Sequence, residues 1–135
     1  MEINRFTDWK YPYIEDGKPT KYNWAIQNLD GLQLGFKADI GAFSYINAKK
    51  GMTIEDEVQI GSHWSIYSIS TIDNSSGEVI LKDNCKIGSH TSILRGFTIG
   101  RNSIIGANSL VNKDIPSNVI AFGVPAKIVR KIEEC

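Results

Sequence analysis

Residues 99–111 read Ile-Gly-Arg-Asn-Ser-Ile-Ile-Gly-Ala-Asn-Ser-Leu-Val, and the spacing of their aliphatic residues decides the fold. An aliphatic residue returns every six positions, usually followed by Gly, with a small residue at the fifth place. The repeat continues over most of the chain, at Leu34, Ile40, Ile46, Ile54, Ile60, Ile66, Ile72, Leu81, Ile87, Ile93, Ile99, Ile105 and Val111. Its phase slips by two residues around Gly51 and by three around Asn74-Ser75-Ser76-Gly77, where the composition favours a turn or a protruding loop.

A period of six fits neither a simple helix nor a simple strand, so the repeating unit is a short strand followed by a corner. Three units make one triangular turn, and successive turns stack at about 4.8 Å, so that backbone donors and acceptors of neighbouring coils pair. The aliphatic residue and the residue two before it are expected to point inward. The Gly that follows is expected at a tight corner where a Cβ would be strained. The sequence therefore predicts an all-β parallel β-helix of roughly four to five coils.

The chain is expected to form a single domain with a cap at each end of the prism. Capping is required because an uncovered end coil offers unpaired backbone groups to other chains. At the N-terminus, the Asp-Gly turn signal inside residues 13–18 predicts a strand or hairpin. At the C-terminus, Ile128, Val129 and Ile132 predict a short helix. The predicted parts are an aromatic-rich cap over residues 1–33, the hexapeptide-repeat β-helix over residues 34–124 and a helical cap over residues 125–135.

Composition narrows the classes of protein further. The 135 residues are 41% hydrophobic, with 15 acidic and 15 basic side chains, which suits one core and argues against nucleic acid as a partner. No stretch approaches the roughly 20 apolar residues of a membrane span, and the first residues lack a signal-peptide core, so a cytoplasmic location is expected. Cys85, one of two cysteines, occupies an inward hexad place as a small apolar filler.

The C-terminal part of the chain resembles a known family. The run from Ile99 to Pro116, followed by residues 121–129, is similar to the closing signature of the hexapeptide-repeat acyltransferases, which have a left-handed parallel β-helix. The Lys-Asp-Ile-Pro and Gly-Val-Pro-Ala-Lys segments are its most specific parts. The resemblance implies a homotrimer, acetyl-CoA as the donor, no metal, and active sites in clefts between adjacent prisms.

Short members of this family commonly acetylate sugars. The resemblance therefore implies an acetyltransferase that acts on a sugar, above all on the amino group of a nucleotide-linked amino sugar used for polysaccharide or glycan synthesis. Two alternatives stay open. One is an O-acetyltransferase of a simple sugar, and the other is a non-catalytic trimeric β-helix assembly subunit, which would bind no acetyl-CoA.

Acyl transfer from a thioester needs a group that takes a proton from the acceptor, and histidine is the usual choice. The chain has two, His63 and His90, each at the third place after an aliphatic residue, where the side chain points outward beside a corner. Counting three hexads per coil assigns the columns as Ile60 with Leu81 and Ile99, and Ile87 with Ile66 and Ile105. The histidines are thus predicted on different sides of one prism, so that His63 of one chain would face His90 of the next across a cleft.

His63 is the candidate general base, and its alternative is a polar residue at a trimer contact. His90 is the weaker candidate, because its context recurs in the family where side chains line the interface or the donor channel. In one branch of the family the catalytic histidine follows an aliphatic position by two residues, and that place here is Asp56, a base only if burial raises its pKa. Another branch orients the sugar with Asn and carboxylate groups, for which Asp73 and Asn74 are candidates; otherwise these two residues make a turn.

The resemblance also implies that CoA lies along the C-terminal coils in the groove between two chains. Small residues there would let the pantetheine arm approach the main chain, and cations would meet the phosphates. The candidates are Gly106, Ala107, Ala121 and Gly123 for the arm, and Lys113, Lys127 and Arg130 for the phosphates. Lys127 and Arg130 would otherwise lie on a solvated helix face. Trp24, Trp64 and Tyr67 are candidates for stacking on a sugar or base, with Trp64 alternatively wedged at a corner.

Overall fold

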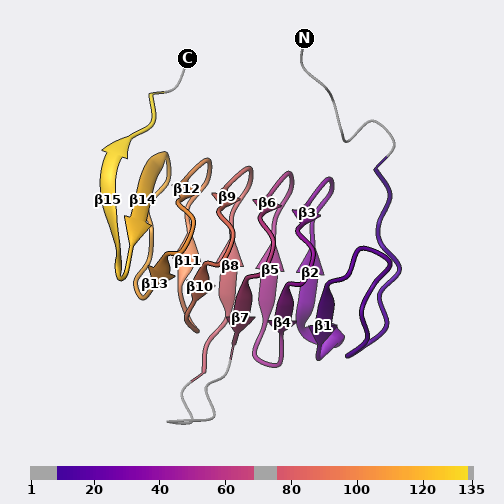
Figure 1. Cartoon of the computed structure of the whole chain (residues 1–135). Coiled ribbons are helices and arrows are strands. Elements are labelled where there is room, and N and C mark those ends of the chain that lie inside the picture. Colours follow the sequence, from indigo (N-terminus) through magenta and orange to yellow (C-terminus); the bar gives the residue numbers. More distant parts are fainter. Residues whose placement is uncertain (1–8, 69–75, 134–135) are drawn as a thin grey trace.

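Short strands dominate the part of the chain that the structure describes, residues 9–68 and 76–133 of a computed structural model (Figure 1). The strands are β1 (Ala25–Gln27), β2 (Leu32–Leu34), β3 (Asp39–Ile40), β4 (Tyr45–Asn47), β5 (Met52–Ile54), β6 (Gln59–Ile60), β7 (Ser65–Tyr67), β8 (Val79–Leu81), β9 (Lys86–Ile87), β10 (Ser92–Ile93), β11 (Thr98–Ile99), β12 (Ile104–Ile105), β13 (Leu110–Val111), β14 (Val119–Gly123) and β15 (Ala126–Lys131). One 3₁₀ turn, η1 (Leu29–Gly31), connects β1 to β2. Within the described residues no helix has the length and apolar composition of a membrane span.

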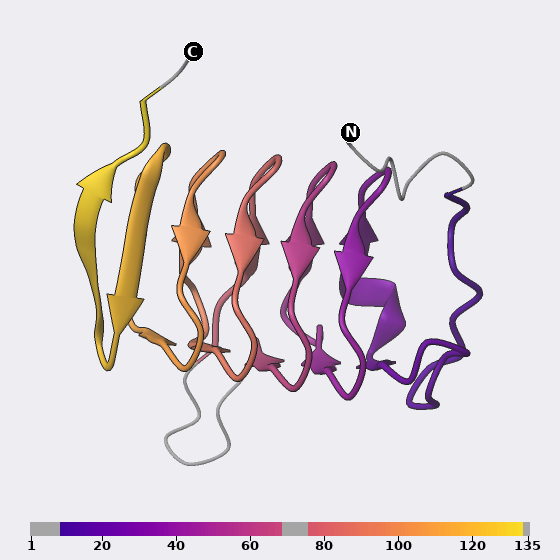
Figure 2. The same ribbon diagram turned by 45° about the horizontal axis from the view of Figure 1, so that its top comes forward.

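The strands form three sheets, and the chain visits them in turn at each coil (Figures 1 and 2). Sheet A has the order β1-β4-β7-β10-β13, sheet B the order β11-β8-β5-β2, and sheet C the order β15-β14-β12-β9-β6-β3. Strand pairs are parallel throughout except at the C-terminal end, where β15 runs antiparallel to β14. The fold is a left-handed parallel β-helix, and the predicted all-β class is confirmed.

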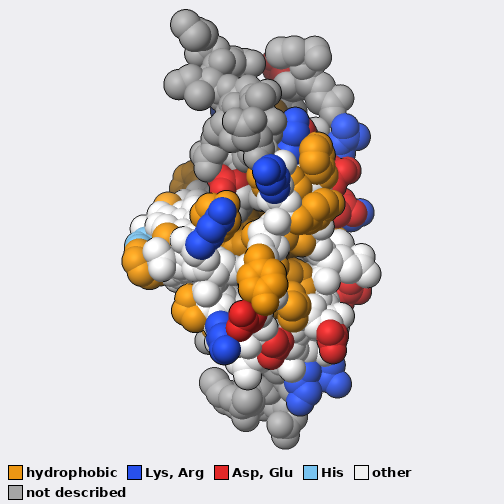
Figure 3. Space-filling model, turned by 90° about the vertical axis from the view of Figure 1, so that its right-hand side faces the viewer, with side chains coloured by type: hydrophobic (Ala, Val, Ile, Leu, Met, Phe, Trp, Pro, Cys, Tyr) orange, Lys and Arg blue, Asp and Glu red, His pale blue; other side chains and the backbone are white. Residues whose placement is uncertain are grey.

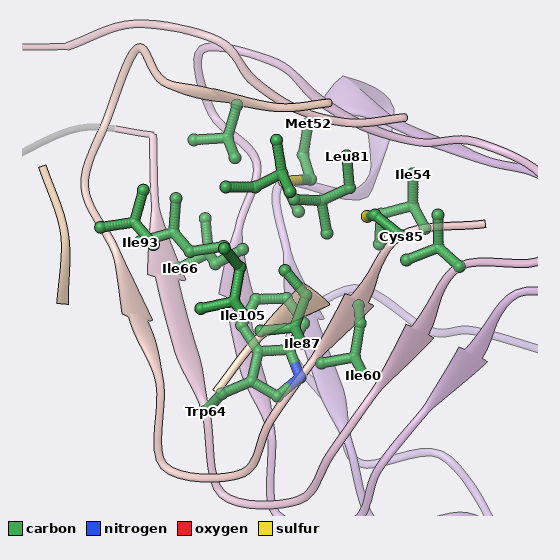
Figure 4. Close-up of a cluster of buried hydrophobic side chains, with 14 of the residues drawn as sticks. Met52, Ile54, Ile60, Trp64, Ile66, Leu81, Cys85, Ile87, Ile93 and Ile105 are labelled. Atoms are coloured by element: carbon green, nitrogen blue, oxygen red, sulfur yellow. The ribbon is translucent and has the colours of Figure 1, made fainter. Parts of the chain in front are cut away.

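The aliphatic residue of each hexad stacks on its equivalents in the coils above and below. The inward columns are Ile26, Ile46, Ile66, Ile93 and Val111 in sheet A, Leu34, Ile54, Leu81 and Ile99 in sheet B, and Ile40, Ile60, Ile87, Ile105 and Ala121 in sheet C. The three columns meet along the axis of the prism, where side chains from all three sheets point toward one another (Figure 4). Each buried aliphatic side chain contributes about 1.5–3 kcal/mol of transfer free energy.

Trp64 occupies an inward place two residues before Ile66, inside the core. Its side chain is 1% exposed. The residues at the same hexad place in the coils on either side, Ser44 and Thr91, are small. The small neighbours leave room for the indole, so Trp64 cannot stack on a ligand as the sequence suggested. Among the described residues, the buried Trp64 Nε1 has no hydrogen-bond acceptor (Figure 4).

Replacing Trp64 tests this packing. Trp64→Ala should lower the free energy of unfolding by about 3–5 kcal/mol, because it leaves a large cavity. Trp64→Phe should cost less than about half as much, because it keeps a six-membered aromatic ring in the core. It also removes an N–H group whose unpaired burial costs about 1–3 kcal/mol. Urea denaturation of the three proteins measures both, and equal losses in the two variants would contradict the argument.

Cys85 lies inward two residues before Ile87, as its hexad place predicted, and its side chain is fully buried. Burial raises the pKa of the thiol from 9.0 to about 12, and the nearby Glu55 carboxylate adds to the shift. The thiol is therefore protonated in the folded protein at neutral pH and is a poor nucleophile.

In a Cys135→Ser variant, which leaves Cys85 as the only cysteine, the folded protein should react with a thiol reagent at pH 8 only after unfolding in guanidinium chloride. Because the folded pKa lies above the unfolded value, the unfolded chain loses this proton first, and stability should decline from about pH 9 toward pH 12. Cys85→Ala in the same background should flatten that decline in pH-dependent urea titrations. Rapid labelling of the native protein would show that the thiol is accessible.

The corners that follow sheets B and C have their unusual backbone conformation at the third place after the aliphatic residue, and not at the Gly. Positive φ angles of 57–62° recur at Lys37, Phe43, Glu57, His63, Asn84, His90, Asn102, Asn108 and Asn118. The Gly residues are needed for close approach instead. A Cβ on Gly88 would lie 2.5 Å from the Ala107 nitrogen, and one on Gly61 would lie 2.7 Å from the Ser89 nitrogen. The expected reason for these glycines was therefore wrong, because the next coil and not the local φ angle excludes a side chain.

The column assignment made from the sequence was also wrong. Ile60 pairs with Ile87, and Ile87 pairs with Ile105, all in sheet C. Ile66 lies in sheet A and Leu81 in sheet B, the next sheet, so one step of the coil separates them where the repeat count assigned two. Counting Ile72 as a hexad of its own shifted the phase of every later column by one sheet.

The predicted C-terminal helix is replaced by β15. Residues 126–131 pair antiparallel with β14, from Gly123 opposite Ala126 to Val119 opposite Lys131. The open edge of β14 offers backbone partners along its length, whereas an isolated helix this short is marginal in water. The apolar stripe that suggested a helix is made of β-branched residues, which suit a strand.

At the other end of the prism, residues 9–24 lie against the first coil without forming a strand (Figure 1). The Asp-Gly pair makes a turn as predicted, with φ 73° at Gly17. The amide of Gly17 donates to the carbonyl of Ile26 over 2.8 Å, and the amide of Thr20 donates to the carbonyl of Trp24. The first bond attaches the segment to β1, the outermost strand of sheet A, and the second closes a turn within the segment.

Candidate active site

The two histidines stack on each other at one corner of the prism. Their ring centroids lie 5.0 Å apart with an interplanar angle of 13°, and both side chains are exposed. The exposed Phe43 ring lies 5.1 Å from His63 on the other side. All three residues occupy the third hexad place on successive coils, between sheets C and A. We call Phe43, His63 and His90 the histidine corner.

This geometry corrects the predicted positions of the histidines. His63 and His90 lie on the same corner of the same chain, and not on opposite sides of a cleft between chains. The physical reason is the pairing of Ile60 with Ile87, which places the two hexads one above the other. The contact between the rings needs no second chain.

His63 has a polar neighbour that can fix its ring. Its Nδ1 lies 3.0 Å from the Ser62 hydroxyl oxygen. In the tautomer whose Nδ1–H donates to that oxygen, Nε2 keeps a lone pair and can accept a proton from an incoming group. Such an exposed, oriented imidazole has the chemistry of a general base.

An open hollow of about 580 Å³ runs along sheet C beside the histidine corner. Stacked glycines line this hollow, and because they carry no side chains, the main chain itself is exposed there. We call it the glycine groove, and its stacked glycines are Gly41, Gly61, Gly88 and Gly106. Ala107 also lines it, so two of the residues expected to bind the donor lie one coil away from His90.

Four further donor candidates, Ala121, Gly123, Lys127 and Arg130, lie at and beyond the end of this groove. Phe122 covers Gly106, where an added Cβ would come within 2.8 Å of the Phe122 Cβ. Lys127 is the strand partner of Phe122, and Arg130 is the partner of Ile120; both cations are exposed on β15.

Main-chain groups at the end of the groove are already paired within the chain. The Gly106 amide donates to the carbonyl of Ala121 over 2.9 Å, and the Gly123 amide donates to the Ser109 hydroxyl over 3.1 Å. Ala121 is 0% exposed, so its side chain belongs to the core. These residues shape the end of the groove but offer fewer free amides than the sequence suggested.

Other candidates come from a different corner. Lys113 is exposed in the connection between sheets A and B, away from the corner between C and A that holds the histidines. Asp73 and Asn74 lie outside the described residues, in the segment that connects β7 of sheet A to β8 of sheet B. Within one chain, the sheets that flank the histidine corner do not bring Lys113 to it.

Asp56 has a structural role. Its Oδ1 accepts a hydrogen bond from the Phe36 amide over 2.8 Å, and its own amide donates to the Asp83 carboxylate over 3.0 Å. The Glu55 carboxylate in turn accepts the Asp83 amide. These carboxylates tie successive coils together at their corner, where the exposed Asp56 side chain accepts a main-chain amide.

Three residues near the site escaped the sequence analysis: Phe43, Ser62 and Phe122. Phe43 holds the same hexad place as the histidines, so correct column phasing would have revealed the stack. Phe122 stands where a Gly is usual, directly after the inward Ala121. Among the described residues, no three His, Cys, Asp or Glu side chains come together as a metal site.

Comparison with known proteins shows which family the repeat resembles. Residues 78–113 match the family described as "Bacterial transferase hexapeptide (six repeats)". A galactoside O-acetyltransferase of Lactococcus lactis is 32% identical over 115 residues, which cover 74% of this chain and 56% of the relative. Residues 78–113 therefore carry the repeat of this transferase family, and the chain spans little more than half the length of this curated relative.

Solved structures share the fold. A maltose O-acetyltransferase of Clostridium difficile is 30% identical with a TM-score of 0.76, covering 83% of this chain and 65% of that one. A hexapeptide-repeat acetyltransferase of Vibrio cholerae in complex with acetyl-CoA is 25% identical with a TM-score of 0.76, covering 82% and 66%. An N-acyltransferase of Bacillus cereus in complex with dTDP and 3-hydroxybutyryl-CoA is 25% identical with a TM-score of 0.57, covering 82% and 70%.

Proposed function

We propose that this chain transfers an acetyl group from acetyl-CoA to a sugar. The observation that carries the proposal is the oriented, exposed His63 at the edge of the glycine groove, in a fold whose relatives are acetyltransferases. The groove supplies a donor site without bulky side chains, and the histidine corner supplies a base beside it.

The chemistry follows from these positions. The acceptor nitrogen or oxygen forms a bond to the thioester carbonyl carbon while the carbon–sulfur bond breaks. His63 Nε2 takes the proton that the acceptor loses and returns it to the departing sulfur, giving the acetylated sugar and free CoA. His90 stacks on His63 and holds the plane of its ring, and the site is otherwise open to both substrates.

The donor would lie along the glycine groove toward β15. Gly106 and Ala107 would line the pantetheine arm, Ala121 and Gly123 would shape the end of the groove, and Lys127 and Arg130 would meet the phosphates. The fit rests on the absence of side chains at the stacked glycines of the groove.

A homotrimer would complete the site. Lys113 comes from the connection between sheets A and B, so it would reach the histidine corner only from a neighbouring prism. In this arrangement Lys113 of the neighbour would contribute to the donor phosphates, and Asp73 and Asn74 would orient the acceptor. Sedimentation velocity at micromolar concentration tests the trimer independently of activity.

Two acceptors remain in competition. The galactoside and maltose enzymes favour a sugar hydroxyl. The likeness to an N-acyltransferase in complex with dTDP favours the amino group of a nucleotide-linked sugar, the acceptor expected from the sequence. A hydroxyl needs the base more than an amine does, because an amine loses its proton near neutral pH.

The test is release of CoA thiol from acetyl-CoA with galactosides, maltose, amino sugars and nucleotide-linked amino sugars as acceptors. We expect acceptor-dependent release together with an increase in Tm that grows with CoA concentration, worth about 2.7 kcal/mol at a hundredfold excess over Kd. A chain that neither releases thiol nor gains stability with CoA would be the assembly subunit, and the enzyme proposal would be abandoned.

His63→Ala should lower kcat by about 10²- to 10⁴-fold with little change in CoA affinity, because the base acts on the acceptor proton and not on donor binding. His63→Gln keeps size and polarity and is the matched control for packing. His90→Ala should lower kcat less and alter the pH profile. An unchanged kcat in the His63 variants at saturating substrates would remove His63 from the mechanism.

A further inference from the structure

The N-terminal end of the prism carries a second hollow, formed by residues 9–24 and the first coil. Its volume is about 440 Å³, and Trp9, Lys10, Lys21, Tyr22 and Asp39 are among its lining residues. We call it the aromatic pocket. Figure 3 faces this end of the molecule, where hydrophobic side chains gather with lysine or arginine side chains beside them.

Trp9 is held in a fixed position at this pocket. Its Nε1 donates a hydrogen bond to the carbonyl of Ala38 over 3.1 Å. Its ring meets those of Tyr11 and Phe36 edge-on, with centroids 4.7 and 5.2 Å away. Tyr22, on the same pocket, is 50% exposed. Fixed rings with exposed surface are suited to stacking against a flat or partly apolar ligand.

Of the three charged residues that line the pocket within the described part of the chain, Lys10 and Lys21 are cations and Asp39 is the one carboxylate. Lys18 pairs with Glu15 over 3.1 Å, but of the residues in 9–68 and 76–133, no carboxylate pairs with Lys10 or Lys21. Lys21 Nζ lies 5.0 Å from the centre of the Tyr22 ring. Lys10, Lys21 and Tyr22 also line an adjoining hollow of about 460 Å³, so that the lysines stand where the two hollows meet.

The aromatic pocket adjoins the proposed reaction site. Asp39 lines both this pocket and the glycine groove. From Asp39 the groove passes Gly41 and Gly61 beside the histidine corner and reaches Gly106 at its far end. A ligand in the aromatic pocket would thus approach His63 from the side opposite to the donor.

We propose that the aromatic pocket binds the nucleoside diphosphate part of a nucleotide-linked sugar acceptor, an inference that rests on the acetyltransferase function proposed above. The base stacks on Trp9 and Tyr22, the diphosphate lies against Lys10 and Lys21, and the sugar extends past Asp39 into the glycine groove. A neutral glycoside would make the same aromatic contacts but would leave both lysines without an anion. The lysines therefore select the charged acceptor.

The probes are uridine diphosphate and thymidine diphosphate, titrated while tryptophan fluorescence is recorded in the presence of saturating CoA. Saturating CoA keeps the probes out of the donor site, which could otherwise bind them because CoA itself contains a nucleoside diphosphate. Trp24 and Trp64 are 4% and 1% exposed, so quenching reports chiefly on Trp9. We expect saturable binding of both probes and none of maltose or a galactoside at equal concentration.

Lys10→Gln with Lys21→Gln should weaken nucleoside diphosphate binding at least about tenfold. Tyr22→Ala should also weaken binding, and it should leave the protein folded because the Tyr22 side chain is exposed. Lys49→Gln with Lys50→Gln, which removes two exposed charges at the corner between sheets A and B, is the matched control and should leave binding unchanged. CoA affinity, measured by thermal shift, should be the same in every variant.

Three results would overturn this inference. They are the absence of nucleoside diphosphate binding in a protein that binds CoA, binding that the pocket variants do not weaken, and equal binding of neutral sugars. Absence of CoA binding is a different failure, since it refutes the acetyltransferase function first.

Discussion

Backbone hydrogen bonds between successive coils are the constraint on which the rest of this structure depends. At the glycine stack they run from Gly41 to Ile60, from Gly61 to Ile87, from Gly88 to Ile105 and from Gly106 to Ala121, at 2.8–2.9 Å. Bonds of this length bring adjacent coils so close that the residue facing the next main chain cannot carry a Cβ. The glycine groove thus results from the stacking of the coils, whether or not a ligand binds in it. The histidine corner follows from the same bonds, because they set one coil's side chains directly above the next.

The six-residue period was sufficient to predict the class of fold, because each short strand must bury one aliphatic side chain and pair with the coils on both sides. It also identified Cys85 as inward-facing. It failed where the period is interrupted. The 15-residue separation between Ile66 and Leu81 contains Ile72 in apparent phase, and periodicity alone does not show that only one step of the coil separates Ile66 from Leu81. The C-terminal end failed for another reason, since the partner that makes residues 126–131 a strand is the edge of β14, which no local pattern reveals.

The candidate site was predicted by residue type better than by position. Both histidines stand at an outward corner, as their hexad places require, but their mutual contact depends on column phase and was missed. Gly106 and Ala107 were expected near the donor and line the groove beside the histidine corner. The aromatic pocket could not be foreseen, because residues 9–24 have no repeat and their position depends on single contacts such as that of Trp9 with Ala38.

The histidine corner belongs to a column of outward side chains that share one backbone conformation and are evenly spaced along the prism axis. Asn23, Phe43, His63, His90 and Asn108 all have φ near 60° on consecutive coils, and their main-chain bonds do not involve their side chains. A side chain at one of these places can be exchanged for another without altering the core beneath it. Proteins that share this fold can therefore change their chemistry one coil at a time. A functional group can move along the axis in steps of about 4.8 Å while the core and its strand pairing stay the same.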